Sequence, residues 1–374
     1  MEPIELRQVG TRSVADGSPL NNFDSLRLLF ALLVILSHSY PLGAGSYDAE
    51  PLYRLTGGQT ELGEIAVWGF FVISGFLITQ SWLRSPSPIK FMKRRIGRIY
   101  PAFIVVAALG AFVIVPYASD AHTYAQFSLL RFLSHTLRLN VWEMPAVFTK
   151  NAHPNVLNGS LWSIPYEFCC YIGVLFLGLC RLIQRRYLVL SLFVVAILCH
   201  VSIDVTGWRA RSASAFLDVV GDPVTWATVL PFFLAGMLFN LLGAQRLLRP
   251  WIAVAAVLVL IASYFVPHAY LVTMPTCGAY ALMQLAHLRA LNPLRLGRYG
   301  DFSYGVYLYA FPVQQLLVMS AGGRMAPLEL FALATPISLL LGCISWFLVE
   351  RHFVLQRHLK RVGENQPRLA KYSA

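Results

Sequence analysis

Two ionisable residues, Arg27 and His38, lie in one otherwise apolar stretch, LRLLFALLVILSH. At about 100° per helical residue their side chains leave the same face of a helix, with a rise of about 16 Å between them. Arg27 alone is explained by reaching to the membrane interface, and His38 alone by an interior hydrogen bond. Ionisable groups inside apolar segments are costly and commonly functional, and the shared face favours that reading for both. An imidazole in such a place can act as a general base.

A second candidate cluster, KFMKRRIGRIYP, precedes another apolar stretch and holds Arg94, Arg95 and Arg98. Positive charges that anchor a membrane protein explain the number of basic residues. They do not explain the i, i+3 spacing of Arg95 and Arg98, which puts both side chains on one face of a helix start. Guanidinium groups bind phosphate oxygens bidentately. The pair is therefore a candidate site for a nucleotide-like anion.

A third cluster, NGSLWSIPYEF, opens a further apolar stretch and contains Ser160, Trp162, Tyr166 and Glu167. The two aromatic residues are typical of a membrane interface. Glu167 lies about one turn inside the apolar segment, where interfacial placement does not account for it. We expect Glu167 to share a depth with His38, because both lie near the same end of their helices. A facing imidazole and carboxylate would suit proton transfer.

Composition indicates the kind of protein that must position these groups. The 374 residues are 57% hydrophobic and only 13% charged, whereas soluble domains carry roughly 25% charged residues. This excludes a cytosolic enzyme, a secreted disulfide-rich domain and a disordered chain. The six cysteines lie in apolar runs without zinc or disulfide spacing, so no metal site is expected. No basic stripe with interleaved aromatic residues points to nucleic acid.

We predict an all-α polytopic membrane protein of about ten transmembrane helices, each roughly 20 residues long. The expected spans are 26–42, 64–83, 100–118, 161–180, 187–205, 224–242, 251–266, 269–288, 303–321 and 327–349. They form one membrane domain over 1–350, with a polar N-terminal tail over 1–22 and a C-terminal tail over 351–374. In the second span, Ser74 and Gly75 predict close helix packing through small residues. Residues 123–139 predict an interfacial amphipathic helix.

The distribution of basic residues predicts the orientation in the membrane. Alternate loops and tails carry 22 Lys and Arg residues on one side and 7 on the other. The richer side is expected to be cytoplasmic. Both termini and the Arg95–Arg98 pair are then cytoplasmic, and the long loop over 119–160 lies outside.

The motifs together resemble those of the acyltransferase-3 family, integral membrane O-acyltransferases that modify bacterial cell-surface and exported glycans. The matching stretches, in the family's order, are FDSLRLLFALLVILSHSY (23–40), FFVISGFLIT (70–79), RRIGRIYP (94–101), NGSLWSIPYEF (158–168), GDFSYGVYLYAFP (300–312) and VER (349–351). Six motifs in order over nearly the whole chain make the resemblance specific.

The resemblance implies residue roles. Arg27 and His38 correspond to an Arg-x10-His pair essential for transfer, and Arg95 and Arg98 to an Arg-x-x-Arg motif on the cytoplasmic side. The Ser-Leu-Trp…Glu element corresponds to Ser160, Leu161, Trp162 and Glu167. Many members carry a histidine where this chain has Ala310. A role for that histidine does not carry over, so His38 is the one histidine expected to be catalytic.

The implied reaction moves an acyl group, with acetyl expected, from cytoplasmic acyl-CoA to a hydroxyl of a carbohydrate acceptor at the outer face of the bacterial cytoplasmic membrane. The expected catalytic residues are His38, Arg27 and Glu167; the donor-binding residues are Arg95, Arg98 and Arg94; the acceptor-binding residues are Trp162, Ser160 and Tyr166. Acyl-CoA is a substrate, and no bound cofactor is expected. General-base catalysis by His38 and a covalent acyl-histidine both fit the residues.

Two other functions fit the composition. A transporter or flippase for glycans or lipid-linked intermediates would also need many helices and buried charges, and a non-catalytic assembly partner is the third possibility. The charged residues cluster at two ends of the predicted bundle, and no repeated half-structure of the kind common in transporters is present. These features favour the acyltransferase. The residues leave the acceptor open among O-antigen, exopolysaccharide, peptidoglycan and small glycosides, and leave succinyl and longer acyl groups open as donors.

Overall fold

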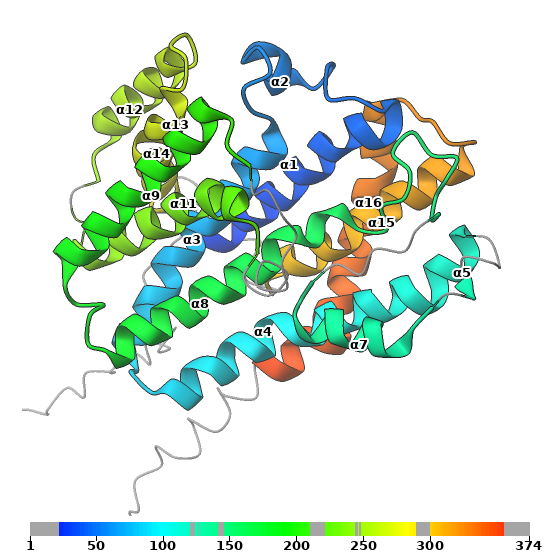
Figure 1. Cartoon of the computed structure of the whole chain (residues 1–374), viewed down its shortest axis with the longest axis horizontal. Coiled ribbons are helices and arrows are strands. Elements are labelled where there is room, and N and C mark those ends of the chain that lie inside the picture. The colour runs from blue at the N-terminus through cyan, green and yellow to red at the C-terminus, as the bar shows by residue number, and fades with distance from the viewer. Residues whose placement is uncertain are drawn as a thin grey trace, which may run out of the picture.

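The computed structural model describes residues 22–119, 124–125, 127–140, 146–209, 221–243, 246, 248–288 and 300–354. Over these ranges the chain is helical, with no strand and one isolated bridge between Ser119 and Val147. The main helices (Figure 1) are α1 (Phe23–Ala44), α3 (Leu62–Arg84), α4 (Pro88–Leu109), α8 (Ser163–Leu179), α9 (Arg186–Thr206), α11 (Pro223–Leu241), α12 (Pro250–Ser263), α15 (Ser303–Ser320) and α16 (Pro327–Ser345). The shorter helices and π- or 3₁₀-turns are α2 (Pro51–Leu55), η1 (Gly110–Ile114), α5 (Val115–Ala118), α7 (Leu129–Leu137), η2 (Gly159–Trp162), α13 (Tyr270–Thr273), η4 (Met274–Gly278), α14 (Ala279–Ala286) and η7 (Trp346–Glu350).

Seven helical stretches of the described residues are long and apolar enough to cross a membrane, so the chain is a multi-pass membrane protein. They are Phe23–Ala44, Leu62–Arg84, Pro88–Ala118, Gly159–Leu179, Arg186–Thr206, Pro223–Leu241 and Pro327–Val354. The all-α prediction is confirmed over the described ranges, whereas the count of ten is not.

Helices also occupy the other three predicted spans, but none of these three is both long enough and apolar enough to count as a membrane-crossing helix. α12 has only 14 residues, and a bilayer core of about 30 Å needs close to 20. The segment from α13 to α14 contains a π-helical turn at Pro275. α15 buries the polar side chains of Gln314 and Gln315, which reduces its apolar character.

α3 lies at the centre of the bundle, where it packs against α1, α8 and α11 (Figure 1). Its contact with α11 depends on two glycines. A Cβ on Gly75 would collide with the carbonyl of Phe233, and one on Gly236 would collide with the carbonyl of Val72. Because neither glycine has a side chain, the two backbones can approach closely. The packing role predicted for Gly75 is confirmed.

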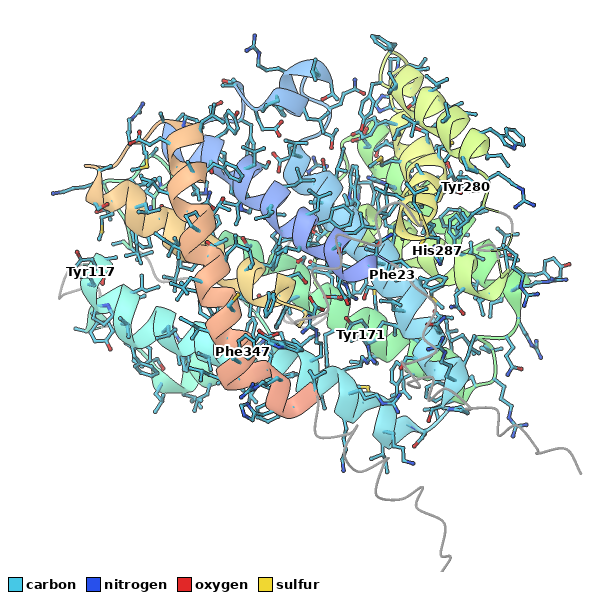
Figure 2. All side chains as sticks on the ribbon, turned by 180° about the vertical axis from the view of Figure 1, so that it is seen from behind. Phe23, Tyr117, Tyr171, Tyr280, His287 and Phe347 are labelled. Atoms are coloured by element: carbon cyan, nitrogen blue, oxygen red, sulfur yellow. The ribbon has the colours of Figure 1, made fainter. Side chains whose placement is uncertain are left out.

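Polar side chains inside the bundle fix α1 against α15. The Gln314 amide donates hydrogen bonds to the Ile35 carbonyl and to Ser39 Oγ, both at 2.8 Å. Both acceptors lie within one turn of His38. The hydrogen bonds therefore hold the part of α1 that carries the candidate base. Seen from behind, Figure 2 shows Phe23 and Tyr171 inside the bundle and Tyr117 at its edge.

Glu50 fixes the loop that precedes α3. Its carboxylate is fully buried and accepts backbone N–H groups from Tyr53 at 2.6 Å and from Leu62 at 3.1 Å. These are unpaired donors at the starts of α2 and α3, which an acidic side chain satisfies well. One carboxylate therefore orients two helix starts beside the candidate site.

The predicted interfacial helix is present but shorter than expected. α7 runs over Leu129–Leu137, and three of the four apolar residues that defined its face, Leu130, Leu133 and Leu137, are exposed. Phe132 packs inward from the opposite side. Residues 123 and 126 of the prediction lie outside the described residues.

Candidate active site

The arginine cluster lines a cavity of about 580 Å³, here called the arginine cavity. It lies between α1, α3, α4, α8 and α15, and five arginines line it: Arg27, Arg84, Arg94, Arg95 and Arg98. Among its described lining residues Glu167 is the one carboxylate. Cations gathered around a space with low-dielectric walls favour an anionic ligand.

Arg98 is engaged by protein carboxylates. Its Nη2 lies 2.6 Å from Asp301 Oδ2 and its Nη1 lies 3.1 Å from Glu350 Oε2. The Glu350 side chain is 1% exposed and also accepts a hydrogen bond from Ser345 Oγ at 2.9 Å. The fork predicted to bind phosphate is thus occupied by two acids, Asp301 just before α15 and Glu350 at the end of η7. The sequence prediction missed both carboxylates, although each belongs to a motif of the resemblance.

Asp301 connects the two predicted arginine motifs. Its Oδ2 lies 3.4 Å from Arg27 Nη1 as well as close to Arg98. Burial by itself would raise the pKa of Asp301, but Arg98 and then Arg27 outweigh it, and the pKa lies below its ordinary value. The hydroxyl of Ser303 donates a further hydrogen bond to this carboxylate. Asp301 therefore remains charged and holds both arginines at the cavity wall.

Arg95 differs from Arg98 although the two are three residues apart. Arg95 Nη2 donates one long hydrogen bond of 3.3 Å to Ser81 Oγ, and its guanidinium lies over the ring of Tyr171 at 5.7 Å. Its Nε is buried without a hydrogen-bond partner among the described residues. Arg95 therefore keeps donors that an anion in the cavity can take up.

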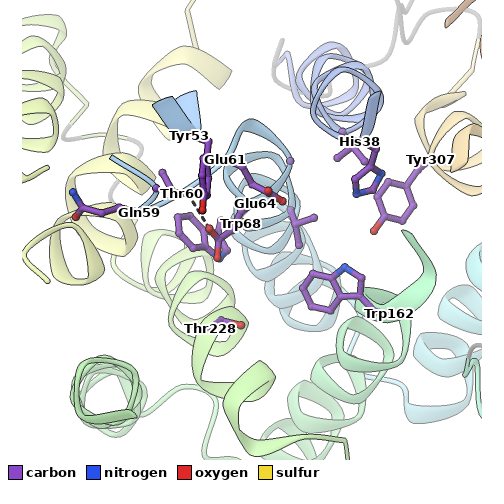
Figure 3. Close-up of a pocket in the computed structure, with 14 residues that line it drawn as sticks. His38, Tyr53, Gln59, Thr60, Glu61, Glu64, Trp68, Trp162, Thr228 and Tyr307 are labelled. Carbon is purple, nitrogen blue, oxygen red and sulfur yellow. Dashed lines mark hydrogen bonds between the residues drawn. The ribbon is translucent and has the colours of Figure 1, made fainter. Parts of the chain in front are cut away.

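His38 lines a separate cavity of about 290 Å³, here called the histidine cavity (Figure 3). His38 comes from α1, Trp162 from η2 and Tyr307 from α15. The His38 Nδ1 lies 3.5 Å from Ser160 Oγ, and its ring meets Phe311 edge-on with centroids 5.4 Å apart. Ser160 is thus a predicted site residue that contacts the imidazole.

Backbone contacts hold Ser160 beside the imidazole. The Tyr307 hydroxyl donates to the Ser160 carbonyl and shares a 2.8 Å hydrogen bond with Ser163 Oγ. The Asn158 amide donates to the Leu308 carbonyl at 2.9 Å. α15 therefore fixes the start of α8, which is the support that a precise site needs. Ala310, where many relatives have histidine, is 1% exposed and packs in the core.

Two acidic residues that we did not predict as site residues, Glu61 and Glu64, also line the histidine cavity (Figure 3). Glu64 accepts a hydrogen bond from Thr60 Oγ1 at 2.9 Å. Burial, and then the charges of Glu64 and Glu50, raise the pKa of Glu61 to about 8. Glu61 is therefore largely protonated at neutral pH and can donate a hydrogen bond. Two carboxyls three residues apart at the start of the predicted span 64–83 are a sequence signal that could have pointed to this cavity.

The structure does not bring Glu167 to His38. Glu167 Oε1 accepts hydrogen bonds from Ser74 Oγ at 2.7 Å and from the Tyr171 hydroxyl at 2.6 Å. It lines the arginine cavity, whereas His38 lines the histidine cavity. The expectation of a shared depth rested on helix ends alone. It did not allow for the rotation of α8, which turns Glu167 toward α3.

Of the three predicted acceptor residues, Trp162 lines the histidine cavity, Ser160 is buried and contacts His38, and Tyr166 does neither. Trp162 is 38% exposed and lines the cavity. The Tyr166 hydroxyl accepts the backbone N–H of Asp222 at 2.8 Å, and its ring packs on Trp226 at 5.0 Å. Tyr166 therefore supports the wall behind Trp162.

The two cavities are neighbours, because Val67 and Tyr307 line both. The arginine cavity lies at the end of the bundle where α1 begins. The histidine cavity lies toward the end where α3 begins. Arg27 and His38, about 16 Å apart along α1, line one cavity each. The two residues of the predicted pair thus lie in neighbouring cavities, Arg27 in the arginine cavity and His38 in the histidine cavity.

The fold and the site define a multi-pass membrane protein with two adjoining polar cavities between its helices, one cationic and one holding a histidine. The chain belongs to the acyltransferase-3 family, because the family's model, described as an acyltransferase domain, matches residues 20–349. An O-acetyl transferase of Shigella phage Sf6 is 32% identical over 346 residues, which cover 89% of this chain and 96% of that relative.

Nodulation protein 10 of Rhizobium leguminosarum bv. viciae is 26% identical over 364 residues, which cover 88% of this chain and 92% of the relative. No solved structure gives a significant match. The protein is therefore an O-acyltransferase, and the resemblance drawn from six motifs is confirmed. The comparisons favour this enzyme over the transporter that composition alone left open.

Proposed function

We propose that the protein moves an acyl group, acetyl in the first instance, from acyl-CoA to a hydroxyl of a carbohydrate. The observation that carries the proposal is the meeting of the arginine cavity and the histidine cavity at Val67 and Tyr307. A donor with phosphates at one end and a thioester at the other matches this arrangement. Its phosphates would lie among cations and its thioester would reach toward His38.

The donor end is held by arginines of the arginine cavity, and among them Arg95 has hydrogen-bonding capacity that is not already taken. Arg95 has a single long side-chain hydrogen bond and an unpaired Nε, and Arg84 and Arg94 line the same cavity. Arg98 instead acts as a positioning residue, because Asp301 and Glu350 occupy its fork. A charge-assisted hydrogen bond to a phosphate contributes about 1.5–3 kcal/mol.

The reaction needs a base near the acceptor hydroxyl, and we assign this role to His38. The imidazole takes the hydroxyl proton while the oxygen attacks the thioester carbon, so that a C–O bond forms and the C–S bond breaks. The proton then passes to the departing thiolate. Such assistance is typically worth ~10²–10⁴-fold in rate. Ser160, 3.5 Å from Nδ1, orients the ring.

The acceptor lies in the histidine cavity. Sugars present hydroxyls at the ring edge and apolar C–H groups on the ring faces. Glu61 and Glu64 offer hydrogen bonds to hydroxyls, and the exposed part of Trp162 offers an aromatic surface for a ring face. Glu167 is assigned to the donor side, because it lines the arginine cavity.

The basic-residue distribution supports a transfer across the bilayer. The side with 22 Lys and Arg residues holds the arginine cavity, and the positive-inside rule puts that side in the cytoplasm, where CoA is made. The acceptor end then faces outward from the bacterial cytoplasmic membrane. Both chain termini would be cytoplasmic.

The proposal is tested with purified protein in detergent, acetyl-CoA labelled in the acetyl group, and a glycan extract from host cells. We expect label in the glycan with the wild type and none with His38→Ala. The control is Ala310→Ser, a small change in the core beside the site that keeps His38 and both cavities. Label retained by His38→Ala at more than a tenth of the wild-type rate would overturn the base assignment.

A further inference from the structure

A third cavity adjoins the histidine cavity on the side away from His38. It has a volume of about 470 Å³ and is lined by residues of three segments: the loop before α3, the end of α9 and the connection from α12 to α13. Gly58 and Gln59 line both this cavity and the histidine cavity. Figure 3 shows Gln59 extending away from His38 toward the α12–α13 segment.

The shared wall between the two cavities is fixed. Gln59 Nε2 donates hydrogen bonds of 2.9 Å to the carbonyls of Thr56 and Tyr264. Gly58 has a φ of +85°, a left-handed conformation that glycine adopts without strain. The loop that separates the two spaces is therefore held in one conformation, and both cavities lie against it.

The third cavity offers an aromatic surface and polar groups together. The rings of Tyr264 and Tyr270 are stacked with centroids 5.5 Å apart and an interplanar angle of 15°. Beside them His268 Nδ1 lies 2.6 Å from Asp204 Oδ2, and these two side chains are 45% and 40% exposed. The ion pair orients a carboxylate oxygen and an imidazole nitrogen at the cavity surface, where both can bind hydroxyl groups.

These features differ from those of the arginine cavity. No arginine or lysine lines the third cavity among the described residues, so it does not favour phosphate. Phe265 and Pro267 add apolar surface to its walls, but the Asp204–His268 ion pair distinguishes the cavity from a purely apolar lipid groove. Aromatic rings next to hydroxyl-binding groups suit a neutral carbohydrate, whose ring faces are apolar and whose edges are polar.

We propose that this cavity is a second acceptor subsite, which binds sugar units next to the one acylated at His38. The inference rests on the proposed function and narrows its acceptor to an oligosaccharide or polysaccharide segment. The acylated unit occupies the histidine cavity, and the chain continues past Gln59 onto Tyr270 and the Asp204–His268 pair. The bond-making step is unchanged, so the subsite acts on acceptor affinity and not on the chemistry.

The test compares short and long acceptors from one source. Host surface glycan is hydrolysed and fractionated into monosaccharides and into oligosaccharides of four or more units, and kcat/KM is measured for each with labelled acetyl-CoA. We expect Tyr270→Ala to lower kcat/KM about 2- to 12-fold for the oligosaccharides, the effect of losing one aromatic contact, and to leave the monosaccharide value unchanged. Asp204→Asn should act in the same direction.

Val205→Ala is the matched control, because Val205 is exposed beside Asp204 and does not line the cavity. Equal losses for short and long acceptors, or no loss for either, would overturn the subsite. Oligosaccharide binding without donor, followed by intrinsic tryptophan fluorescence, separates the two proposals. Wild-type binding that Tyr270→Ala weakens, in a protein that transfers no acetyl group, refutes the proposed function while supporting the subsite. Wild-type binding unaffected by Tyr270→Ala refutes the subsite.

Discussion

Arg95 and Arg98 are three residues apart and line the same cavity. The structure nevertheless predicts different effects of replacing each by alanine: mainly a loss of stability for Arg98 and mainly a loss of donor binding for Arg95. Arg98→Ala would leave Asp301 and Glu350 without their shared guanidinium. Removing one partner of a buried ion pair typically costs about 3–5 kcal/mol. Glu350, with a 1% exposed side chain, would keep only its Ser345 hydrogen bond. Asp301 would retain Arg27 at 3.4 Å, which limits its share of the loss.

Arg95→Ala should lower the free energy of unfolding less than Arg98→Ala does. The side chain gives up one 3.3 Å hydrogen bond and its contacts with the rings of Phe91 and Tyr171, together worth about 1.5–3 kcal/mol. If Arg95 contacts a donor phosphate, the same change forfeits about 1.5–3 kcal/mol of binding, which is roughly a 10- to 150-fold rise in the KM for acetyl-CoA. The acceptor KM should not move.

The assay measures two quantities for each variant. Unfolding in detergent, followed by circular dichroism against increasing dodecyl sulfate, reports stability, and initial rates against acetyl-CoA report the donor KM. Arg98→Ala should be the less stable variant by about 1–2 kcal/mol, and the double variant Arg98→Ala/Glu350→Gln should recover part of the loss. Equal stability for the two single variants, with no recovery in the double variant, would refute the assignment of Arg98 as a positioning residue.

Three further predictions follow from other parts of the site and fold. His38→Ala should abolish transfer without changing membrane insertion, measured as turnover per mole of purified protein; turnover above a tenth of wild type would contradict it. Because the pKa of Glu61 is raised from an ordinary value of about 4.5 to about 8, its contribution to folding becomes less favourable as pH rises from about 4.5 to 8. Glu61→Gln should therefore raise the melting temperature at pH 8 and leave it unchanged below pH 4.5, and a variant that is less stable at pH 8 would disprove this. Gly75→Ala should lower stability by about 1–3 kcal/mol through overpacking against α11, whereas Gly173→Ala, where a Cβ meets nothing within 4 Å, should not; equal effects of the two would argue against close α3–α11 packing.

Helix positions and the polar clusters followed from the sequence because both depend on local pattern. The apolar run around Arg27 and His38 is one helix, α1, and Gly75 marks a close helix contact as its size implied. Arg95 and Arg98 share a cavity because i, i+3 spacing fixes a common face. The shared faces are relations within one helix, and the small size of Gly75 indicates a close neighbour without identifying which helix it is.

What the sequence did not predict depends on how helices meet. Glu167 turned toward Ser74 and away from His38, because periodicity does not determine which neighbour a helix face contacts. The pairing of Arg98 with Glu350 joins residues 252 positions apart, and no local pattern indicates it. The place of Glu61 and Glu64 at the histidine cavity depends on the loop held by Glu50, which no local pattern predicts.

The central claim is that the donor enters at the arginine cavity and the acceptor is modified at the opposite face. It is tested most directly in sealed vesicles of known orientation, with labelled acetyl-CoA supplied only on the side of Arg95 and glycan only on the side of Trp162. We expect labelled glycan in this arrangement and none when the two substrates are exchanged between the sides. Transfer that requires donor and acceptor on one face would contradict the passage of an acyl group across the bilayer.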